Sequence, residues 1–245
     1  MAHQETQEQT RWERGKLPPS PAHIAYFPVF LNLQGRRCVV IGTGEEVERK
    51  VRALREAGAQ VTVLTPHPTS GLVALAEAGH ITLHQRPYQE GDLRGAFLAI
   101  SATTADYPLS RRIAQEAQRE GVLLNVVDTP HLCTWIAPAI VQRGALTIAI
   151  STNGLSPALA RFIRERLEHL LPEEWGTLLD MVALLRREVR RRGIHPSPQA
   201  WQEALHSPET QRLLSAHDWE GLWEHLLTRL TATGTHPLSQ EGEKI

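Results

Sequence analysis

The chain is poor in several features that mark specialised classes of protein. It has two cysteines, Cys38 and Cys133, in 245 residues, too few for a disulfide framework or a cysteine-rich zinc site. Its 26 basic and 27 acidic residues nearly cancel, which gives no bulk electrostatic preference for nucleic acid or a membrane surface. No apolar run approaches the roughly 20 residues that a membrane span requires. These absences favour a soluble globular protein.

The two ends of the sequence differ from its middle. The first 23 residues are polar and proline-rich and lack the apolar centre of a signal peptide, so we expect a disordered tail over 1–23 and a cytoplasmic protein. A second polar tail is expected over 231–245. The length and the 41% of hydrophobic residues are sufficient for one large or two smaller cores between them.

A strand, a glycine turn and a helix follow one another at residues 37–58. Cys38–Ile41 is a short apolar run, typical of a parallel strand that is buried on both faces. Gly42, Thr43 and Gly44 then allow a tight turn and close approach of a ligand to the backbone. Apolar residues at helical spacing follow, so the free N–H groups of a helix start face this turn. The stretch predicts a site for the pyrophosphate of a dinucleotide cofactor.

The glycine pattern is incomplete. Val47 stands at the third position of G-x-G-x-x-G, where glycine or alanine would let the helix pack more closely on the strand. Glu45 and Glu46 suit the positive end of a helix dipole, but beside a pyrophosphate they must point away and leave recognition to backbone N–H groups. An ordinary tight strand-to-helix turn is the alternative interpretation.

Strands and helices alternate through the first half of the chain. Further strands are predicted at Gln60–Thr65, Ile81–Gln85, Ala96–Ser101 and Val122–Val127, and helices at Ser70–Ala78 and Tyr107–Glu120. This order predicts an α/β fold with a doubly wound parallel sheet of the Rossmann type. Ligands bind such sheets at the carboxyl ends of the strands, where Gly42, Thr65, Thr103 and Asp128 all fall.

The end of the second predicted strand lacks the acidic residue that usually binds the adenine ribose. Thr65, Pro66 and His67 stand there instead, so hydroxyl and backbone groups would have to bind the ribose. We favour NAD over NADP because no arginine stands there for a 2′-phosphate.

Asp128 follows the strand Val122–Val127 directly and precedes Thr129-Pro130. Its carboxylate would project into the cofactor crevice, where it could accept the proton released when the cofactor takes a hydride. Capping of the following turn is an equally good interpretation from chemistry. His131, three residues on, could relay protons, although a loop histidine is more often solvated.

These segments together resemble the precorrin-2 dehydrogenase domain of sirohaem synthases, from about Ala25 to Gly193. The motifs that carry the resemblance are Gly42-Thr43-Gly44 with Glu48-Arg49-Lys50, Thr65-Pro66, Asn125 to Pro130 (NVVDTP), Pro138-Ala139, and Ile150 to Arg161 (ISTNGLSPALAR). The resemblance implies NAD-dependent oxidation of precorrin-2 to sirohydrochlorin. Some members of this family also insert ferrous iron to make sirohaem.

The resemblance also implies roles for particular residues. Asp128 would be the catalytic residue. The cofactor contacts would be Gly42, Thr43, Gly44, Glu45, Glu46, Thr65, Pro66, Ala102 and Thr103. The tetrapyrrole contacts would be Asn125, Ser151, Thr152, Asn153, Gly154, Ser156 and Arg161. No dedicated metal site is visible, so ferrous iron would enter as a substrate.

An interlocked homodimer is implied as well. We expect a Rossmann domain over 24–136, a dimerisation region over 137–171 and a C-terminal helical domain over 172–230. The predicted strand Ala145–Ser151 would be exchanged or paired at the subunit contact. Two other classes remain open: a non-catalytic NAD-binding regulatory module, and a tetrapyrrole-binding carrier without chemistry.

Overall fold

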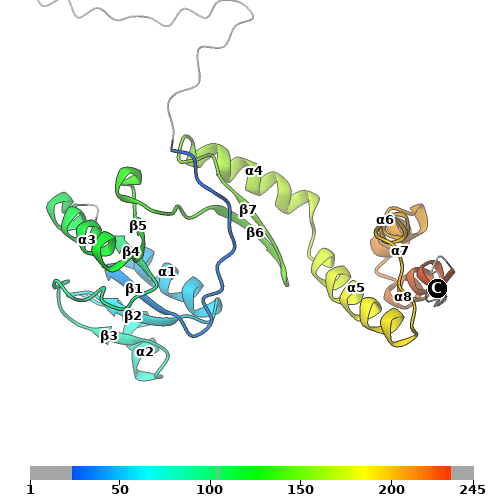
Figure 1. The fold of residues 1–245 in the computed structure, drawn as a ribbon, viewed down its shortest axis with the longest axis horizontal. Helices are drawn as coiled ribbons and strands as arrows, with labels where there is room; N and C mark the ends of the chain where they lie inside the picture. The colour runs from blue at the N-terminus through cyan, green and yellow to red at the C-terminus, as the bar shows by residue number, and fades with distance from the viewer. Residues whose placement is uncertain (1–23, 104, 233–245) are drawn as a thin grey trace, which may run out of the picture. The chain divides into compact units, whose positions relative to one another are not determined.

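The computed structural model describes residues 24–103 and 105–232 and divides the chain into two compact units (Figure 1). The N-terminal unit extends to Ala137 and includes Asn153–Leu155; the C-terminal unit comprises Pro138–Thr152 and the chain from Ser156 onward. No helix in this described part of the chain is both long and apolar enough to cross a membrane.

The N-terminal unit is built on a five-stranded sheet in the order β3-β2-β1-β4-β5 (Figure 1). Its strands are β1 (Arg37–Gly42), β2 (Gln60–Leu64), β3 (Thr82–His84), β4 (Leu98–Ala102) and β5 (Leu123–Val126), and its helices are α1 (Glu45–Glu56), α2 (Ser70–Glu77) and α3 (Tyr107–Glu120). All four strand pairings are parallel, so the carboxyl ends of the strands lie on one edge. Since β1 has β2 on one side and β4 on the other, the strand order reverses there, at the point where such sheets bind ligands. The predicted Rossmann-type sheet is confirmed.

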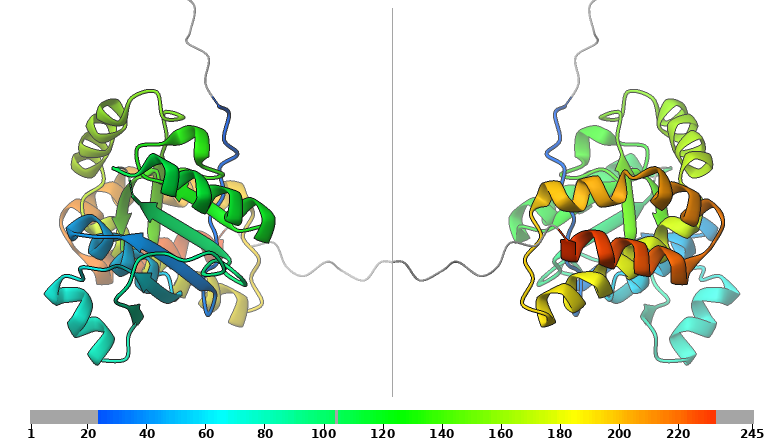
Figure 2. Two further views of the ribbon diagram at one scale, coloured as in Figure 1. Left: turned by 90° about the vertical axis from the view of Figure 1, so that its left-hand side faces the viewer. Right: turned by 90° about the vertical axis from the view of Figure 1, so that its right-hand side faces the viewer.

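The sheet is buried on both faces. Cys38 and Val40 of β1 belong to the core under α1 and α2, whereas Val39 and Ile41 belong to the core under α3. Figure 2 shows α3, in green, lying across one face of the strands. All four side chains are at most 2% exposed, which explains why β1 reads as a continuous apolar run.

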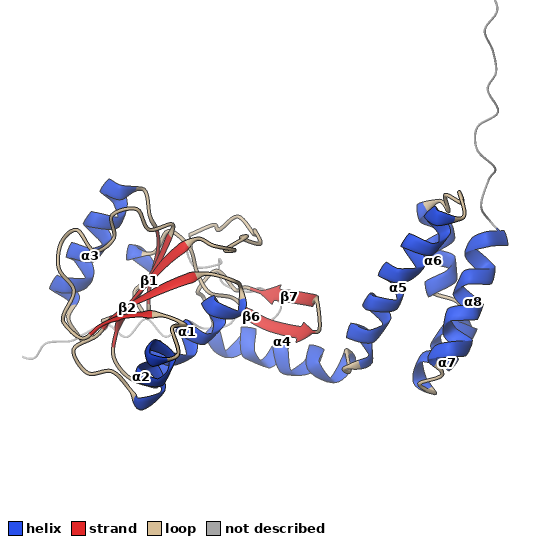
Figure 3. Cartoon of the chain, turned by 90° about the horizontal axis from the view of Figure 1, so that it is seen from below, coloured by secondary structure: helices blue, strands red, loops and turns tan. Residues whose placement is uncertain are grey.

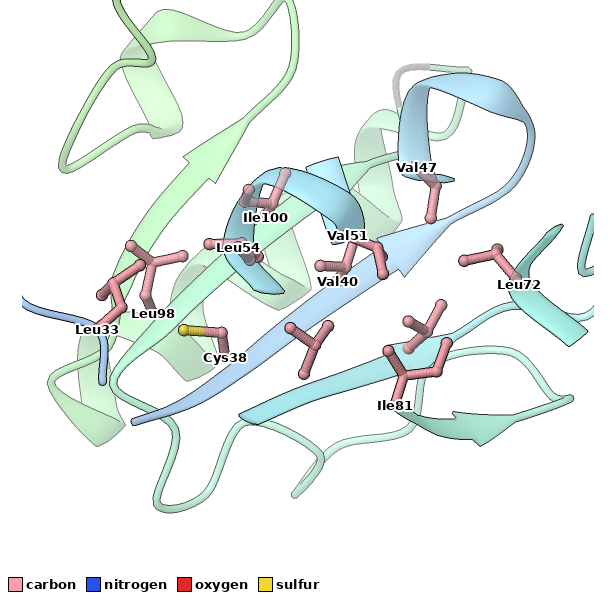
Figure 4. Close-up of a cluster of buried hydrophobic side chains, with 12 residues drawn as sticks. Leu33, Cys38, Val40, Val47, Val51, Leu54, Leu72, Ile81, Leu98 and Ile100 are labelled. Carbon is pink, nitrogen blue, oxygen red and sulfur yellow. The ribbon is translucent and has the colours of Figure 1, made fainter. Parts of the chain in front are cut away.

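Val47 is accommodated as a core residue. It is fully buried in the same cluster as Val40 and Leu72, and Figure 4 shows these side chains in the layer between the helices and the sheet. A valine at the third glycine position is therefore part of the packing of α1 on β1.

The C-terminal unit begins with an antiparallel hairpin of β6 (Ala139–Arg143) and β7 (Leu146–Ile150), drawn in red beside α4 in Figure 3. The strand predicted at Ala145–Ser151 is present as β7, which pairs with β6 of the same chain. Its exchange or pairing at a subunit contact stays a prediction. The sequence did not reveal β6, because Val141 is its one buried residue and an alternating apolar pattern is missing.

Five helices follow the hairpin: α4 (Pro157–Leu170), α5 (Glu174–Arg191), α6 (Pro198–Leu205), α7 (Pro208–Ser215) and α8 (Trp219–Ala232). Ser156 caps α4, since its Oγ accepts the Leu159 N–H at 3.1 Å. The core of α5 to α8 contains fully buried Leu185 and Leu222. Four tryptophans, Trp175, Trp201, Trp219 and Trp223, pack against this core.

Arg143 of β6 connects the hairpin to the end of α4 through hydrogen bonds. Its Nε donates to the Leu171 carbonyl at 2.6 Å and its Nη2 to the Glu168 carbonyl at 3.0 Å, which satisfies acceptors that a helix end leaves unpaired. Gly176 of α5 lies so close to this strand end that a Cβ there would be 3.0 Å from the Arg143 carbonyl oxygen. Hairpin, α4 and the start of α5 are therefore packed as one body.

A buried carboxylate ties the connection between β3 and β4 to α3. Glu116 is 1% exposed, the Tyr88 hydroxyl donates to its Oε2, and the Leu93 N–H donates to its Oε1 at 2.8 Å. Burial and the hydrogen bond to Glu116 raise the pKa of Tyr88, so the phenol remains a donor.

We expect Tyr88→Phe to lower the free energy of unfolding by about 1–3 kcal/mol, because Glu116 stays buried and loses a donor. Urea unfolding followed by circular dichroism measures the change. Tyr107→Phe is the matched control, since Tyr107 is 48% exposed and its loss of a hydroxyl should cost less than about 0.5 kcal/mol. Equal losses in the two variants would contradict the role of the Glu116 hydrogen bond.

Candidate functional site

The two glycines of the turn have different geometric roles. Gly42 ends β1 opposite Ala102 of β4 and has φ +137°, and a Cβ there would lie 2.8 Å from the Ala102 carbonyl oxygen. Gly44 has φ +88°, but a Cβ there would meet no described atom within 4 Å. Gly42 therefore permits the close approach of two strands, whereas Gly44 faces open space into which a ligand fits.

The start of α1 suits an anion. Its N-cap is Gly44, and no side chain of the described residues caps it, whereas a side chain caps each of α2, α3, α4, α6 and α7. The first intrahelical bond runs from the Glu48 N–H to the Gly44 carbonyl at 3.3 Å. The N–H groups of Glu45, Glu46 and Val47 therefore remain for a ligand, and the helix dipole favours a negative one. A cofactor pyrophosphate fits this cradle.

Two acidic side chains of α1, those of Glu46 and Glu48, have partners away from the glycine turn. Glu46 forms ion pairs with Arg49 and Lys50 in the next turn of the helix. Glu48 accepts the Thr69 hydroxyl at 2.6 Å, and this bond together with Arg52 lowers the pKa of Glu48. Glu45 is exposed. These contacts leave the backbone N–H groups as the anion-binding part of the turn.

The residues that were predicted to contact the cofactor after β2 and β4 lie on the same edge of the sheet as the glycine turn. Thr65 is fully buried, and its hydroxyl accepts the His67 N–H at 3.3 Å, so its side chain holds the turn that continues into Pro66. Thr103 Oγ1 lies 2.7 Å from Ser101 Oγ and 2.9 Å from Ser110 Oγ. This chain of hydroxyls connects the end of β4 next to Ala102 with α3.

Asp128 lies at the tip of a β-turn at the carboxyl end of β5. The Thr129 N–H donates to the Val126 carbonyl at 3.2 Å to close the turn, and Asp128, its third residue, is exposed with φ +56°. Since β4 alone separates β5 from β1, the carboxyl ends of these two strands lie about 10 Å apart, and Asp128 and the glycine turn follow them on one edge. A dinucleotide whose pyrophosphate lies at Gly44 can reach Asp128 with its nicotinamide half.

His131 has a partner at this edge. It belongs to the short 3₁₀ helix Pro130–Leu132, and its Nε2 lies 3.1 Å from the hydroxyl of Tyr107, the first residue of α3. Both side chains are exposed. They border the loop that carries Asp128.

Asn125, a predicted substrate contact, forms hydrogen bonds within the protein. Its side chain is 8% exposed, and its Nδ2 donates to the Trp135 carbonyl at 3.1 Å and to Cys133 Sγ at 3.7 Å. The amide is therefore used within the protein, below the turn that carries Asp128. Nothing in the sequence pattern separates this use from a ligand contact.

The polar segment after β7 has a defined shape. Thr152 Oγ1 accepts the Ser156 N–H at 3.2 Å, and Asn153 and Gly154 between them have φ +51° and +79°. The segment follows Ser151 and leads directly into the N-cap of α4. Arg161, on the first turns of α4, is exposed and forms an ion pair with Glu165 at 3.0 Å. The segment and Arg161 offer hydroxyl, amide and guanidinium groups to a ligand.

Comparison with known proteins matches both parts of this arrangement. Residues 29–139 match the family described as putative NAD(P)-binding, and residues 143–170 match the central domain of sirohaem biosynthesis proteins. The chain is 37% identical over 199 residues to a siroheme synthase of Nitrosococcus oceani, which covers 80% of this chain and 42% of the relative. Over these residues the chain is similar in sequence to sirohaem synthases.

Other comparisons agree with this relationship. A siroheme synthase of Pseudomonas fluorescens is 41% identical over 196 residues, 78% of this chain and 42% of the relative. The solved structure of SirC, a precorrin-2 dehydrogenase, has a TM-score of 0.68 at 22% identity and covers 84% of this chain and 100% of that chain, which shows a shared fold. The chain spans less than half the length of the curated proteins that it matches. Its resemblance to the family and its nicotinamide-dinucleotide domain, both predicted from the sequence, are confirmed.

The described residues contain no group of three or more His, Cys, Asp or Glu residues that could hold a metal ion. The candidate site is the cofactor edge of the sheet with Asp128, where the uncapped start of α1 and an exposed carboxylate lie.

Proposed function

We propose that this protein is an NAD-dependent precorrin-2 dehydrogenase that produces sirohydrochlorin. The observation that carries the proposal is the position of the uncapped start of α1 and the exposed Asp128 on one edge of the parallel sheet. Matches to NAD(P)-binding and sirohaem biosynthesis families over 29–139 and 143–170 support it.

The reaction removes a hydride and a proton from precorrin-2, and NAD, when bound, accepts the hydride. The N–H groups that follow Gly42, Thr43 and Gly44 would hold the pyrophosphate of the cofactor. Asp128 accepts the proton, for which an exposed carboxylate at the end of β5 is well placed. NAD is favoured over NADP because β2 ends in Thr65 and Pro66, without an arginine for a 2′-phosphate.

The tetrapyrrole substrate bears acetate and propionate groups. We assign their binding to Arg161 and to the polar segment from Ser151 to Ser156, because a guanidinium binds carboxylates through paired hydrogen bonds and hydroxyl groups donate to them. Exposure of Arg161 leaves its guanidinium accessible beside its ion pair with Glu165.

We also propose that the protein is a homodimer, with a dimerisation region over 137–171. Helix α4 presents an apolar stripe at helical spacing that contains Leu159, Phe162 and Leu170, which are 49%, 53% and 70% exposed. Leu155 precedes the helix and is 48% exposed. A row of this kind is typical of a surface that a second protein chain covers.

We expect Leu159→Asp to convert the dimer to a monomer, because a carboxylate would be buried without a partner at the contact. Sedimentation-velocity measurements separate the two masses. Leu184→Asp is the control: Leu184 is 54% exposed on α5, outside the proposed region, and this variant should remain dimeric. A wild-type protein that sediments as a monomer at micromolar concentration would contradict the proposal.

The activity is tested by mixing the purified protein with precorrin-2 and NAD under anaerobic conditions and recording NADH formation and the tetrapyrrole spectrum. NADH formation with conversion to sirohydrochlorin supports the proposal. Cofactor binding without turnover would support a regulatory module, and tetrapyrrole binding without turnover a carrier. A parallel reaction with ferrous ion tests whether iron is a further substrate.

A further inference from the structure

Cys133 contacts both ends of the turn that carries Asp128. Its Sγ accepts the Val126 N–H at 3.1 Å and lies 3.2 Å from the Val126 carbonyl and 3.4 Å from the Thr129 carbonyl. Val126 and Thr129 are the first and last residues of this β-turn. One sulfur therefore bridges the two positions that define the turn.

The thiol of Cys133 is a hydrogen-bond donor as well as an acceptor. Burial raises its pKa, so it keeps the proton that it gives to the carbonyl of Val126 or of Thr129. The other cysteine, Cys38, lies fully buried in β1 and belongs to the core under α1.

The strand below the turn is held from the same segment. Leu124 donates to Thr134 Oγ1 at 2.7 Å and accepts the Thr134 N–H at 2.8 Å, while Asn125 donates to the Trp135 carbonyl. Because β5 is an edge strand of the sheet, these contacts take the place of a neighbouring strand. The loop from Val127 to Leu132 is therefore closed at its base by Cys133, Thr134 and Trp135.

The conformation of Asp128 needs such support. Its φ of +56° lies in the left-handed region, which residues with a Cβ adopt at a cost and keep only when their surroundings fix it. The carboxylate is exposed and has no hydrogen-bond partner among the residues that the structure describes. The direction of this side chain is thus set by the backbone of the turn.

We propose that Cys133 is a positioning residue: its thiol clamps the turn at Val126 and Thr129 and so holds the Asp128 carboxylate in the orientation that accepts the proton. This inference rests on the proposed function. The contacts of Cys133 with the turn belong to the loop, and their effect on the turn can be measured by hydrogen exchange without turnover.

Three variants test the proposal in the full chain. Cys133→Ala removes the clamp and should lower kcat for NADH formation about 10- to 100-fold, the usual cost of a small displacement of a catalytic group, while Kd for NAD stays unchanged. Cys133→Ser keeps a donor and an acceptor and should recover part of the rate. Cys38→Ala removes the other thiol, lowers the melting temperature, and should leave kcat unchanged.

A double-mutant cycle separates positioning from a general loss of structure. If Cys133 acts through Asp128, the double variant with Cys133→Ala and Asp128→Asn should be no slower than Asp128→Asn by itself. Hydrogen exchange supplies the second readout, since the Val126 amide should exchange at least about fivefold faster in Cys133→Ala than in the wild type.

The outcomes distinguish the two proposals. A full rate in Cys133→Ala beside an inactive Asp128→Asn would overturn the role of Cys133 and leave the proposed function intact. Unchanged exchange of the Val126 amide, or losses that add in the double variant, would also overturn it. Absence of NADH formation by the wild-type protein would overturn the proposed function, and with it the role of the clamp in that reaction.

Discussion

Asp128→Asn is expected to lower kcat for NADH formation by at least about 100-fold, because the turn keeps its shape while the carboxylate that we propose as the proton acceptor is lost. Asparagine is chosen because it tolerates the left-handed conformation that Asp128 adopts at φ +56°. Alanine would add backbone strain to the loss of the carboxylate, and the two causes could not be separated.

Stopped-flow measurement of NADH formation under anaerobic conditions gives kcat, and fluorescence titration gives Kd for NAD. We expect Kd to remain within about twofold of the wild type, since binding depends on the glycine turn and not on the exposed carboxylate. Asp180→Asn is the control, because Asp180 is an exposed carboxylate on α5. Comparable turnover in Asp128→Asn and the wild type would show that Asp128 only closes its turn, the alternative that the sequence left open.

The second large effect concerns the cofactor. Gly44→Ala should raise Kd for NAD about 10- to 100-fold, because a methyl group enters the open space at the start of α1. Each hydrogen bond between a backbone N–H and a charged phosphate contributes about 1.5–3 kcal/mol, and displacement of the anion weakens such a bond. The φ of +88° also adds strain to the variant.

Gly35→Ala is the matched control for that strain. Gly35 has φ +67°, and a Cβ there would likewise meet no described atom within 4 Å, but it precedes β1 at the opposite end from the turn. Both variants should lose stability by about 1–3 kcal/mol in urea unfolding, whereas Kd for NAD should change in Gly44→Ala alone. Equal affinities in the two variants would exclude the glycine turn as the pyrophosphate site.

Helices, strands and turns of this protein could be predicted where the sequence has a local, periodic pattern of apolar residues or a characteristic residue at a cap or turn. Tyr107–Glu120 was predicted with the bounds that α3 has, because Asp106 caps it and Gly121 ends it with φ +68°. The strands of the sheet were found to within two residues, since most of them are buried on both faces and read as apolar runs. The glycine turn was visible for the same reason, as its conformation demands particular residues at fixed positions.

Contacts between residues that are distant in the sequence were harder to predict. Strand β6 escaped prediction because a two-stranded hairpin buries Val141 and little else of that strand. The hydrogen bond from Asn125 to the Trp135 carbonyl could not be predicted, because it depends on the path of the loop that follows β5; the predicted substrate contact of Asn125 stays a prediction. The role of Cys133 could not be predicted for the same reason. Its contacts with the backbone of Val126 and Thr129 form only when the fold brings these residues together.

Because the start of α1 is uncapped, the stability of the N-terminal unit is expected to depend on the concentration of the cofactor. Without a ligand, the first turn of this helix lacks the acceptor that a side chain provides at the starts of α2 and α3. The pyrophosphate would complete that turn, so a dinucleotide at about 100 times its Kd would add about 2.7 kcal/mol to the stability of the N-terminal unit. The lifetime of the protein against proteases would then follow the nicotinamide pool of the cell.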